Sequence, residues 1–485
     1  MDVLQKGSMD IPAATMDIPA ATMDIPAATM VIPAATMDIL PSKVATRPMK
    51  IMVPEILGIV CSNLEIEDVR RFRLCCRAFA NAGACYVHNK VVIYFHETDF
   101  EMLRQISSDP IAARNVQSLV YFGENYGPIK HSMEQFRRLH DRYWEITSAT
   151  SKDEGKPLPP RLGDQQMLEL YSKYGHAFDR EQSIIRNNED ISCIREVISK
   201  FTALREVKVS KSWNLGDARG KSPFRGCIVP LSSSEKPDGR GMLESVLDAV
   251  FEKKIKLKKL TAGKISWRWF QKPSAEMSRT IFYLSELTCL DLCIATGMIG
   301  DRGGARIRLD AEIPKCRSVI KTGILRRIIK SLTRLKALSV TFDSYSDKHG
   351  FAASLEDVIE PNHTWEHLDS LRLESVACSR SGLVSIFKRH RRTLKSLCLM
   401  DICLGRTSWE GLLIQTRRTL DLRHACICGE LFGFREFPPL RREYWNVGIP
   451  GEFDGAYPTR DDINDYLLDK ESTEPCPLNR HSVFY

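Results

Sequence analysis

Leu368-Asp-Ser-Leu371-Arg-Leu373 and Leu394-Lys-Ser-Leu397-Cys-Leu399 repeat one short pattern, Leu-x-x-Leu-x-Leu, and begin 26 residues apart. Alternating apolar residues over such a run predict a strand with one buried face. Near variants and a shortened last copy start at Leu204, Leu257, Leu287, Leu335 and Leu420. Helical patterns lie between the copies, at 242–251, 324–332, 383–388 and 409–414. We therefore predict an α/β protein in which strands and helices alternate.

The spacing of the copies favours one arrangement of these strands and helices. One strand and one helix every 20 to 29 residues is typical of leucine-rich solenoids, and the last interval fits that range. The two preceding intervals are longer, 33 and 48 residues, and the asparagine ladder of regular repeats is missing from the sequence. We predict an irregular leucine-rich-repeat-like β/α solenoid over residues 91–437, with an insertion near 125–200. A doubly wound α/β domain is the alternative, because it has the same alternation.

Residues 52–86, MVPEILGIVCSNLEIEDVRRFRLCCRAFANAGACY, precede this region and predict short helices. Pro54 suits the first helical position, since its missing N–H would be unpaired there in any case. Asp68 suits the cap or the first turn of a following helix. Apolar residues recur at helical spacing in both segments: Ile56, Leu57, Val60, Leu64, Val69, Leu74 and Phe79. About 35 residues bury too little surface to be stable alone, so we expect this module to dock on a neighbour or a partner.

The order of these residues resembles the F-box. Glu55-Ile56-Leu57 and Arg73-Leu74-Cys75-Cys76-Arg77-Ala78-Phe79 match the motifs Glu-Ile-Leu and Arg-Leu-x-Cys-Arg-x-Phe. The opening Leu-Pro of the family falls on Met52-Val53, with Pro54 one place late. The resemblance implies a three-helix unit at 51–90 that binds a Skp-family adaptor, and through it a cullin. The implied contacts are Pro54, Ile56, Leu57, Val60, Leu64, Val69, Leu74 and Phe79. An ordinary helical hairpin in a larger core is the alternative.

Within residues 365–432, the two leucine patterns, with Trp365 before the first and Gly405-x-x-Ser408-Trp409 after the second, resemble the repeat region of fungal F-box proteins. Together with the F-box-like stretch, the resemblance covers residues from about 50 to 470. It implies a substrate-recognition adaptor of a cullin-type (SCF) ubiquitin ligase, whose repeats bind a target protein. A protein-interaction scaffold outside any ligase is the alternative.

Both ends of the chain differ in character from the middle. Residues 9–36 contain three copies of MDIPAAT and one of MVIPAAT, so a proline recurs every seven residues. Because an interior proline costs a helix about 3 kcal/mol, the period of seven does not predict a coiled coil, and we expect residues 1–50 to be disordered. Residues 438–485 are expected to form a C-terminal cap and tail, with a short helix at 461–468 covering the last repeat.

The composition predicts an ordinary globular protein: 43% of its 485 residues are hydrophobic and its formal net charge is +8. Basic clusters such as 253–259 and 388–392 fall near the ends of predicted helices, where cations complement the helix dipole. Nucleic-acid binding is therefore not predicted. The sequence has neither the roughly 18-residue apolar run of a membrane helix nor the pattern of a secretion signal, and we expect a cytoplasmic or nuclear protein.

The sequence predicts neither a metal nor a cofactor, and no catalytic activity. The 15 cysteines lie mostly in apolar runs without the paired spacing of zinc sites, as expected of free thiols in a reducing compartment. Gly297-Met-Ile-Gly300-Asp-Arg-Gly303-Gly304 lacks the Gly-Lys-Ser/Thr ending of a phosphate loop. His363 and His367 have helical spacing, but they precede a predicted strand, where they would not share a face.

Overall fold

The structure is a computed structural model that describes residues 53–123, 125–126, 129–153, 161–210, 241–296, 298–299, 307–308, 312–343, 350–434, 442–448 and 460–480. Residues 53–485 form one unit. The predicted disordered tail at 1–50 lies outside the described residues, as does most of the glycine-rich segment 297–304.

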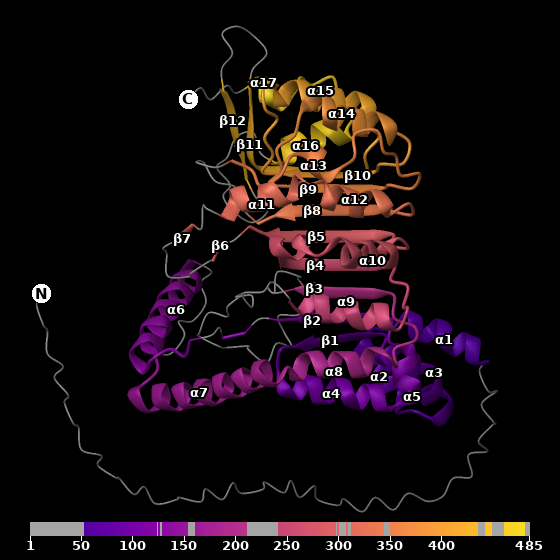
Figure 1. Ribbon diagram of the computed structural model, residues 1–485, viewed down its shortest axis with the longest axis vertical. Helices are drawn as coiled ribbons and strands as arrows, with labels where there is room; N and C mark the ends of the chain where they lie inside the picture. The colour runs from indigo at the N-terminus through magenta and orange to yellow at the C-terminus, as the bar shows by residue number, and fades with distance from the viewer. Residues whose placement is uncertain are drawn as a thin grey trace, which may run out of the picture. The chain divides into compact units, whose positions relative to one another are not determined.

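Ten strands form one open sheet, and their order follows the chain (Figure 1). Their bounds are β1 (Lys90–Tyr94), β2 (Ser118–Phe122), β3 (Glu206–Ser210), β4 (Lys259–Ser266), β5 (Cys289–Ala295), β8 (Ala337–Phe342), β9 (Ser370–Glu374), β10 (Ser396–Met400), β11 (His424–Phe434) and β12 (Arg442–Val447). Neighbours are parallel from β1 to β11, and β12 is antiparallel to β11. A separate two-stranded sheet pairs β6 (Met298–Ile299) with β7 (Ile307–Arg308).

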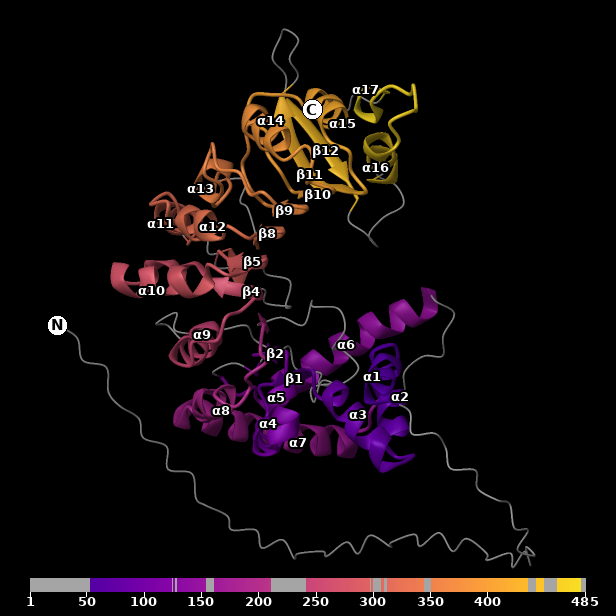
Figure 2. The same ribbon diagram turned by 90° about the vertical axis from the view of Figure 1, so that its right-hand side faces the viewer.

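Helices connect the strands. Their bounds are α1 (Pro54–Ser62), α2 (Ile66–Arg73), α3 (Arg77–Val87), α4 (Glu97–Ser108), α5 (Pro110–Asn115), α6 (Met133–Asp153), α7 (Asp164–Asn187), α8 (Glu189–Ile198), α9 (Met242–Glu252), α10 (Ser274–Leu284), α11 (Glu312–Ile320), α12 (Ile324–Ser331), α13 (Leu355–Val358), α14 (Arg380–Arg389), α15 (Trp409–Thr419), α16 (Arg460–Leu468) and α17 (Pro477–Arg480). Figure 2 shows α9, α10 and α12 on one side of the sheet, and α1 to α3 and α6 toward the other. The predicted alternation of strands and helices is confirmed.

The leucine pattern has one structural meaning in the six copies from Leu204 to Leu394, whereas the shortened last copy, Leu420 and Leu422, lies before β11 and not in it. Its second and third leucines lie in the strand, so Leu371 aligns with Leu338 and Leu397 on the neighbouring strands. The first leucine precedes the strand, and all three are buried against the helices in one continuous core. Because the side-chain period of a strand is two, the residues between the leucines point to the other face of the sheet.

The strand order of the large sheet differs from that of a doubly wound domain. A doubly wound sheet reverses its strand order at a switch point. In the described part of the chain, each new strand of the large sheet adds beside the preceding one, and no reversal occurs. The segment near 125–200 contains the long helices α6 and α7, whose residues Phe136, Tyr174 and Phe178 form a second, smaller core.

The C-terminal segment covers the last parallel strand. In α16, Ile463 and Leu467 are fully buried, and the Asn464 side chain accepts the backbone N–H of Ile427 on β11 at 3.1 Å. Gly429 in β11 has φ +80°, and a Cβ there would lie 2.2 Å from Asp401 Oδ1. Glycine therefore lets β11 turn from its parallel neighbour toward β12. Among the described residues, no helix is long and apolar enough to cross a membrane.

Candidate functional site

The first candidate surface is built on α1 to α3. Pro54 occupies the start of α1, as predicted, and Leu57 and Cys61 on one side of the helix are buried. Val69 of α2 is 1% exposed. A Cβ on Gly83 of α3 would lie 2.5 Å from Arg73 Cγ, so this glycine permits close packing of α3 on α2. Asp68 lies in the first turn of α2, and Glu65 takes the cap position without a side-chain hydrogen bond.

Exposure divides the eight residues predicted to contact an adaptor into three groups. Leu57 and Val69 are buried within the unit itself. Val60, Leu64 and Phe79 are half-buried, and the Phe79 ring stacks on Phe72 with 4.2 Å between centroids. Pro54, Ile56 and Leu74 are exposed. A partner can therefore reach the third group directly, whereas the first group can act only by holding the helices together.

Val53 and Ile59 extend the exposed apolar side of α1 and were not singled out in the sequence. Val53, Ile56 and Ile59 are 53%, 48% and 63% exposed, and they follow at intervals of three residues, so neighbours in this series adjoin on the helix surface. We call these three residues the α1 patch. The sequence does indicate this patch, because apolar residues occur on two sides of α1 and packing against one neighbour buries only one side.

The second candidate surface is the face of the sheet opposite the buried leucines. Its central row is set by the register and runs from β3 to β11 through Lys208, Thr261, Asp291, Ser339, Arg372, Cys398 and Cys426. We call this row and its flanking residues the polar face. Arg372 donates to Glu374 Oε2 at 2.6 Å, and Thr341 donates to the same oxygen at 3.2 Å. These contacts hold charged side chains in place on a surface of parallel strands.

Three cysteines meet at one end of the polar face. Cys398 and Cys426 are opposite each other on neighbouring strands, and the Sγ atoms of Cys426 and Cys428 are 3.7 Å apart. Hydrogen bonds from the thiols of Cys398 and Cys428 lower the pKa of Cys426, and the positive charges of Arg460 and Arg372 act in the same direction. No disulfide joins the cysteines that the structure describes.

Cys426 should therefore react at lower pH than an ordinary cysteine, because the thiolate is the nucleophile. We expect iodoacetamide to alkylate Cys426 several-fold faster at pH 6 than the exposed Cys75, as measured by mass spectrometry of the peptides. In Cys398→Ala one donor is lost, the pKa of Cys426 rises, and the reaction should move to higher pH. Equal pH profiles for Cys426 in the parent and the variant would contradict this assignment.

The histidines near the leucine patterns take part in packing. His390 is 1% exposed, and its Nε2 accepts the backbone N–H of Trp365 at 3.1 Å. Its Nδ1 therefore carries the proton, which it donates to the carbonyl of Ile386 at 2.9 Å. Burial lowers the pKa of His390. His363 packs edge-on against Trp365, and the described residues contain no group of three or more side chains suited to hold a metal ion.

Comparisons with known proteins add no assignment to these surfaces. No protein-family model matches the sequence, and no curated protein matches it significantly. The candidate function therefore depends on the resemblance of the motifs and on the exposure and chemistry of the two surfaces.

Proposed function

We propose that this protein is a substrate-recognition adaptor of a cullin-type ubiquitin ligase. In this proposal α1 to α3 form an F-box-like unit that binds a Skp-family adaptor. The ten-stranded sheet with its helices forms an irregular leucine-rich-repeat-like solenoid that binds a target protein. The chain contributes proximity and no chemistry of its own, because holding a target near the ligase raises the effective concentration of its lysines at the reacting centre.

The α1 patch is the observation that carries the proposal. Large apolar side chains are exposed at ten positions in the described residues, and four of them, Val53, Ile56, Ile59 and Leu74, fall within the first 22 of these residues. Exposed apolar residues gathered in this way are typical of interaction sites. They lie in the F-box-like stretch, and Ile56 and Leu74 are among the contacts implied by the resemblance.

The order of the strands supports the second half of the proposal. Successive strands add along one direction, as in repeat proteins in which each repeat contacts its neighbours. Such an array leaves one face of the sheet free of the repeat helices, and the polar face carries Asp291, Arg372 and Glu374 there. Charged groups arranged on a rigid surface favour a partner of complementary charge. We propose the polar face as the target surface.

Replacing Ile56 and Ile59 with aspartate tests the adaptor contact without opening the core of the unit. Burying one isoleucine in an interface contributes about 1.5 to 3 kcal/mol, so the double variant should bind a purified Skp-family adaptor at least about a hundredfold more weakly. Affinity would be measured by isothermal titration calorimetry. Leu57→Asp is unsuitable, because Leu57 is 2% exposed and a charge there would unfold the unit.

Leu168→Asp is the matched control. Leu168 on α7 is 53% exposed, so the same kind of change is made at an exposed apolar residue outside the F-box-like unit. This control should bind the adaptor like the parent chain. If the parent chain is folded and binds no adaptor, the ligase proposal is wrong, and α1 to α3 are instead part of a protein-interaction scaffold.

A further inference from the structure

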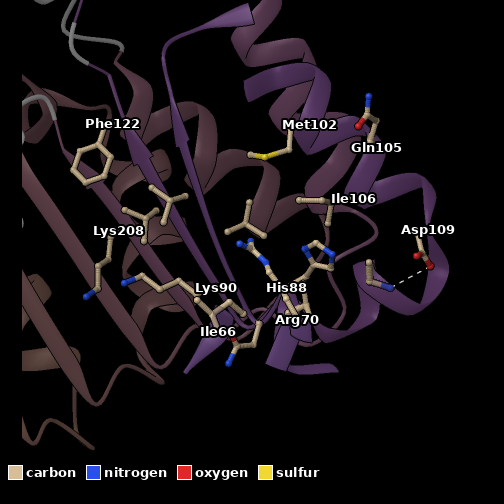
Figure 3. Close-up of a pocket in the computed structure, with 16 residues that line it drawn as sticks. Ile66, Arg70, His88, Lys90, Met102, Gln105, Ile106, Asp109, Phe122 and Lys208 are labelled. Atoms are coloured by element: carbon tan, nitrogen blue, oxygen red, sulfur yellow. Dashed lines mark hydrogen bonds between the residues drawn. The ribbon is translucent and has the colours of Figure 1, made fainter. Parts of the chain in front are cut away.

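A cavity of about 660 Å³ lies where the F-box-like unit meets the first strands of the sheet. Its wall includes residues of α2, the segment that joins α3 to β1, the strands β1 to β3, and the helices α4 and α5 (Figure 3). Cavities of this size are typical of small-molecule sites, which combine apolar walls with a few polar groups. Its chemistry therefore indicates what kind of ligand it can hold.

Apolar side chains form the inner wall. Val92, Val120 and Phe122 come from the first two strands, and Met102 and Ile106 come from α4. Figure 3 shows Met102 and Ile106 on the α4 side of the cavity and Phe122 on the sheet side. Met102 and Val92 present apolar surface to this space, whereas Phe122 and Val120 are only 1% and 4% exposed and are covered by neighbouring protein atoms. Such a wall favours a hydrocarbon body.

Three of the four charged side chains in the wall are basic: Arg70, Lys90 and Lys208. Arg70 is paired with Glu67 at 2.6 Å, and Lys208 is paired with Glu206 at 3.4 Å. Lys90 has no ion pair with any residue that the structure describes. Two further titratable groups line the wall.

Asp109 and His88 are these two groups. Asp109 is the cap of α5, and its Oδ1 accepts the backbone N–H groups of Ile111 at 2.8 Å and Ala112 at 3.2 Å. Its negative charge faces the start of α5, and Figure 3 shows Asp109 on the opposite side of the cavity from Lys90 and Lys208. Burial and the nearby Arg73 and Arg70 lower the pKa of His88, which makes this ring neutral at pH 7.

The edge of the sheet adds a hydrogen-bond donor. β1 is the edge strand. The N–H of Phe95 donates to Phe122 on β2, whereas the N–H of Tyr94 points the other way and donates to Asp99 at 2.7 Å. The N–H groups of a strand alternate between its two edges, so the N–H of Val92 points away from β2. Val92 is one of the residues that line the cavity.

We infer that this cavity binds a small amphipathic monoanion, a carboxylate with a hydrocarbon body. The carboxylate lies near Lys90, with Arg70 and Lys208 as further positive groups. The hydrocarbon body packs on Met102 and Val92, the apolar side chains of the wall with accessible surface. The ligand contacts both α2 and β1, so binding stabilises the junction between the helical unit and the sheet. This inference does not depend on the proposed ligase function.

Decanoate is the probe, used below its micelle concentration with the full chain, and binding is measured by isothermal titration calorimetry. 1-Decanol and decylammonium have the same hydrocarbon body without the negative charge, and both should bind at least about tenfold more weakly than decanoate. Lys90→Gln should weaken decanoate binding about tenfold and leave decanol binding unchanged. Lys336→Gln, a change at an exposed lysine directly before β8, should change neither.

Val92→Trp places a large side chain in the cavity from an edge strand and should weaken binding of both decanoate and decanol. Its circular dichroism spectrum must match that of the parent chain. Three results would each overturn the inference: no decanoate binding to the parent chain, equal affinities for decanoate and decanol, or decanoate binding that Lys90→Gln and Val92→Trp leave unchanged.

Discussion

Replacing Trp409 with alanine should lower the free energy of unfolding by about 3 to 5 kcal/mol, the usual range for a deleted core tryptophan. Trp409 begins α15 and is fully buried. Its indole Nε1 donates to the carbonyl of Phe432 at 3.0 Å, and its backbone N–H donates to Glu443 Oε2 at 3.1 Å. The indole therefore connects α15 to β11, and the backbone N–H of Trp409 connects α15 to β12. The variant loses packing and leaves the Phe432 carbonyl without this donor.

Trp409→Phe separates the two contributions. Phenylalanine keeps most of the apolar volume and removes the indole donor, so the expected loss is smaller, about 1 to 3 kcal/mol. Urea unfolding followed by circular dichroism measures both variants. A Trp409→Ala protein with the midpoint of the parent chain would show that this end of the sheet does not contribute to the cooperative core.

Glu181→Gln should stabilise the region around α7 at alkaline pH and leave it unchanged at acid pH. Glu181 is 4% exposed, and the backbone N–H of Tyr126 donates to its two carboxylate oxygens at 2.9 and 3.0 Å. Burial raises the pKa of Glu181 to about 8, against the opposing effect of the Tyr126 hydrogen bond. The folded chain therefore holds a proton on Glu181 at neutral pH, whereas the unfolded chain, with an ordinary pKa near 4.5, does not.

The sign of the pH dependence follows from this difference. Between about pH 4.5 and 8 the folded state binds more protons than the unfolded state, so the free energy of unfolding falls as the pH rises. The pKa difference corresponds to a loss on the order of 5 kcal/mol by pH 9. Glutamine keeps an oxygen acceptor for Tyr126 and cannot ionise, so the variant should lack this loss.

Amide hydrogen exchange of peptides from α7, corrected for the intrinsic effect of pH, measures this local stability. Protection in the parent chain should fall between pH 5 and 9, and protection in Glu181→Gln should not. Glu169→Gln, a change at an exposed glutamate on the same helix, should behave like the parent chain. Parallel pH dependences for Glu181→Gln and the parent would rule out a buried proton on Glu181.

The sequence predicted those features that depend on local spacing. Leu368, Leu371 and Leu373 indicated a strand with one buried face, and the helical patterns between copies indicated the connecting helices. Pro54 indicated where α1 begins. The sequence also showed that Pro54 lies one place later than the proline of the motif that this stretch resembles. These features follow from the side-chain periods of strands and helices and from the backbone of proline, and a single segment contains that information.

The tertiary structure decided which of these residues a partner can reach and which distant residues meet. Leu57 and Ile56 are adjacent in the sequence, yet Leu57 packs inside the helical unit and Ile56 is exposed, because α3 covers one side of α1 only. The cavity beside Lys90 depends on the fold, because residues of α2, β1, β2 and α4 together line it. The position of Cys426 opposite Cys398 depends on the register between β10 and β11. The sequence by itself thus determined the alternation of strands and helices and the position of the motifs. Burial, register and the two surfaces required the fold, because they arise from contacts between segments far apart in the chain.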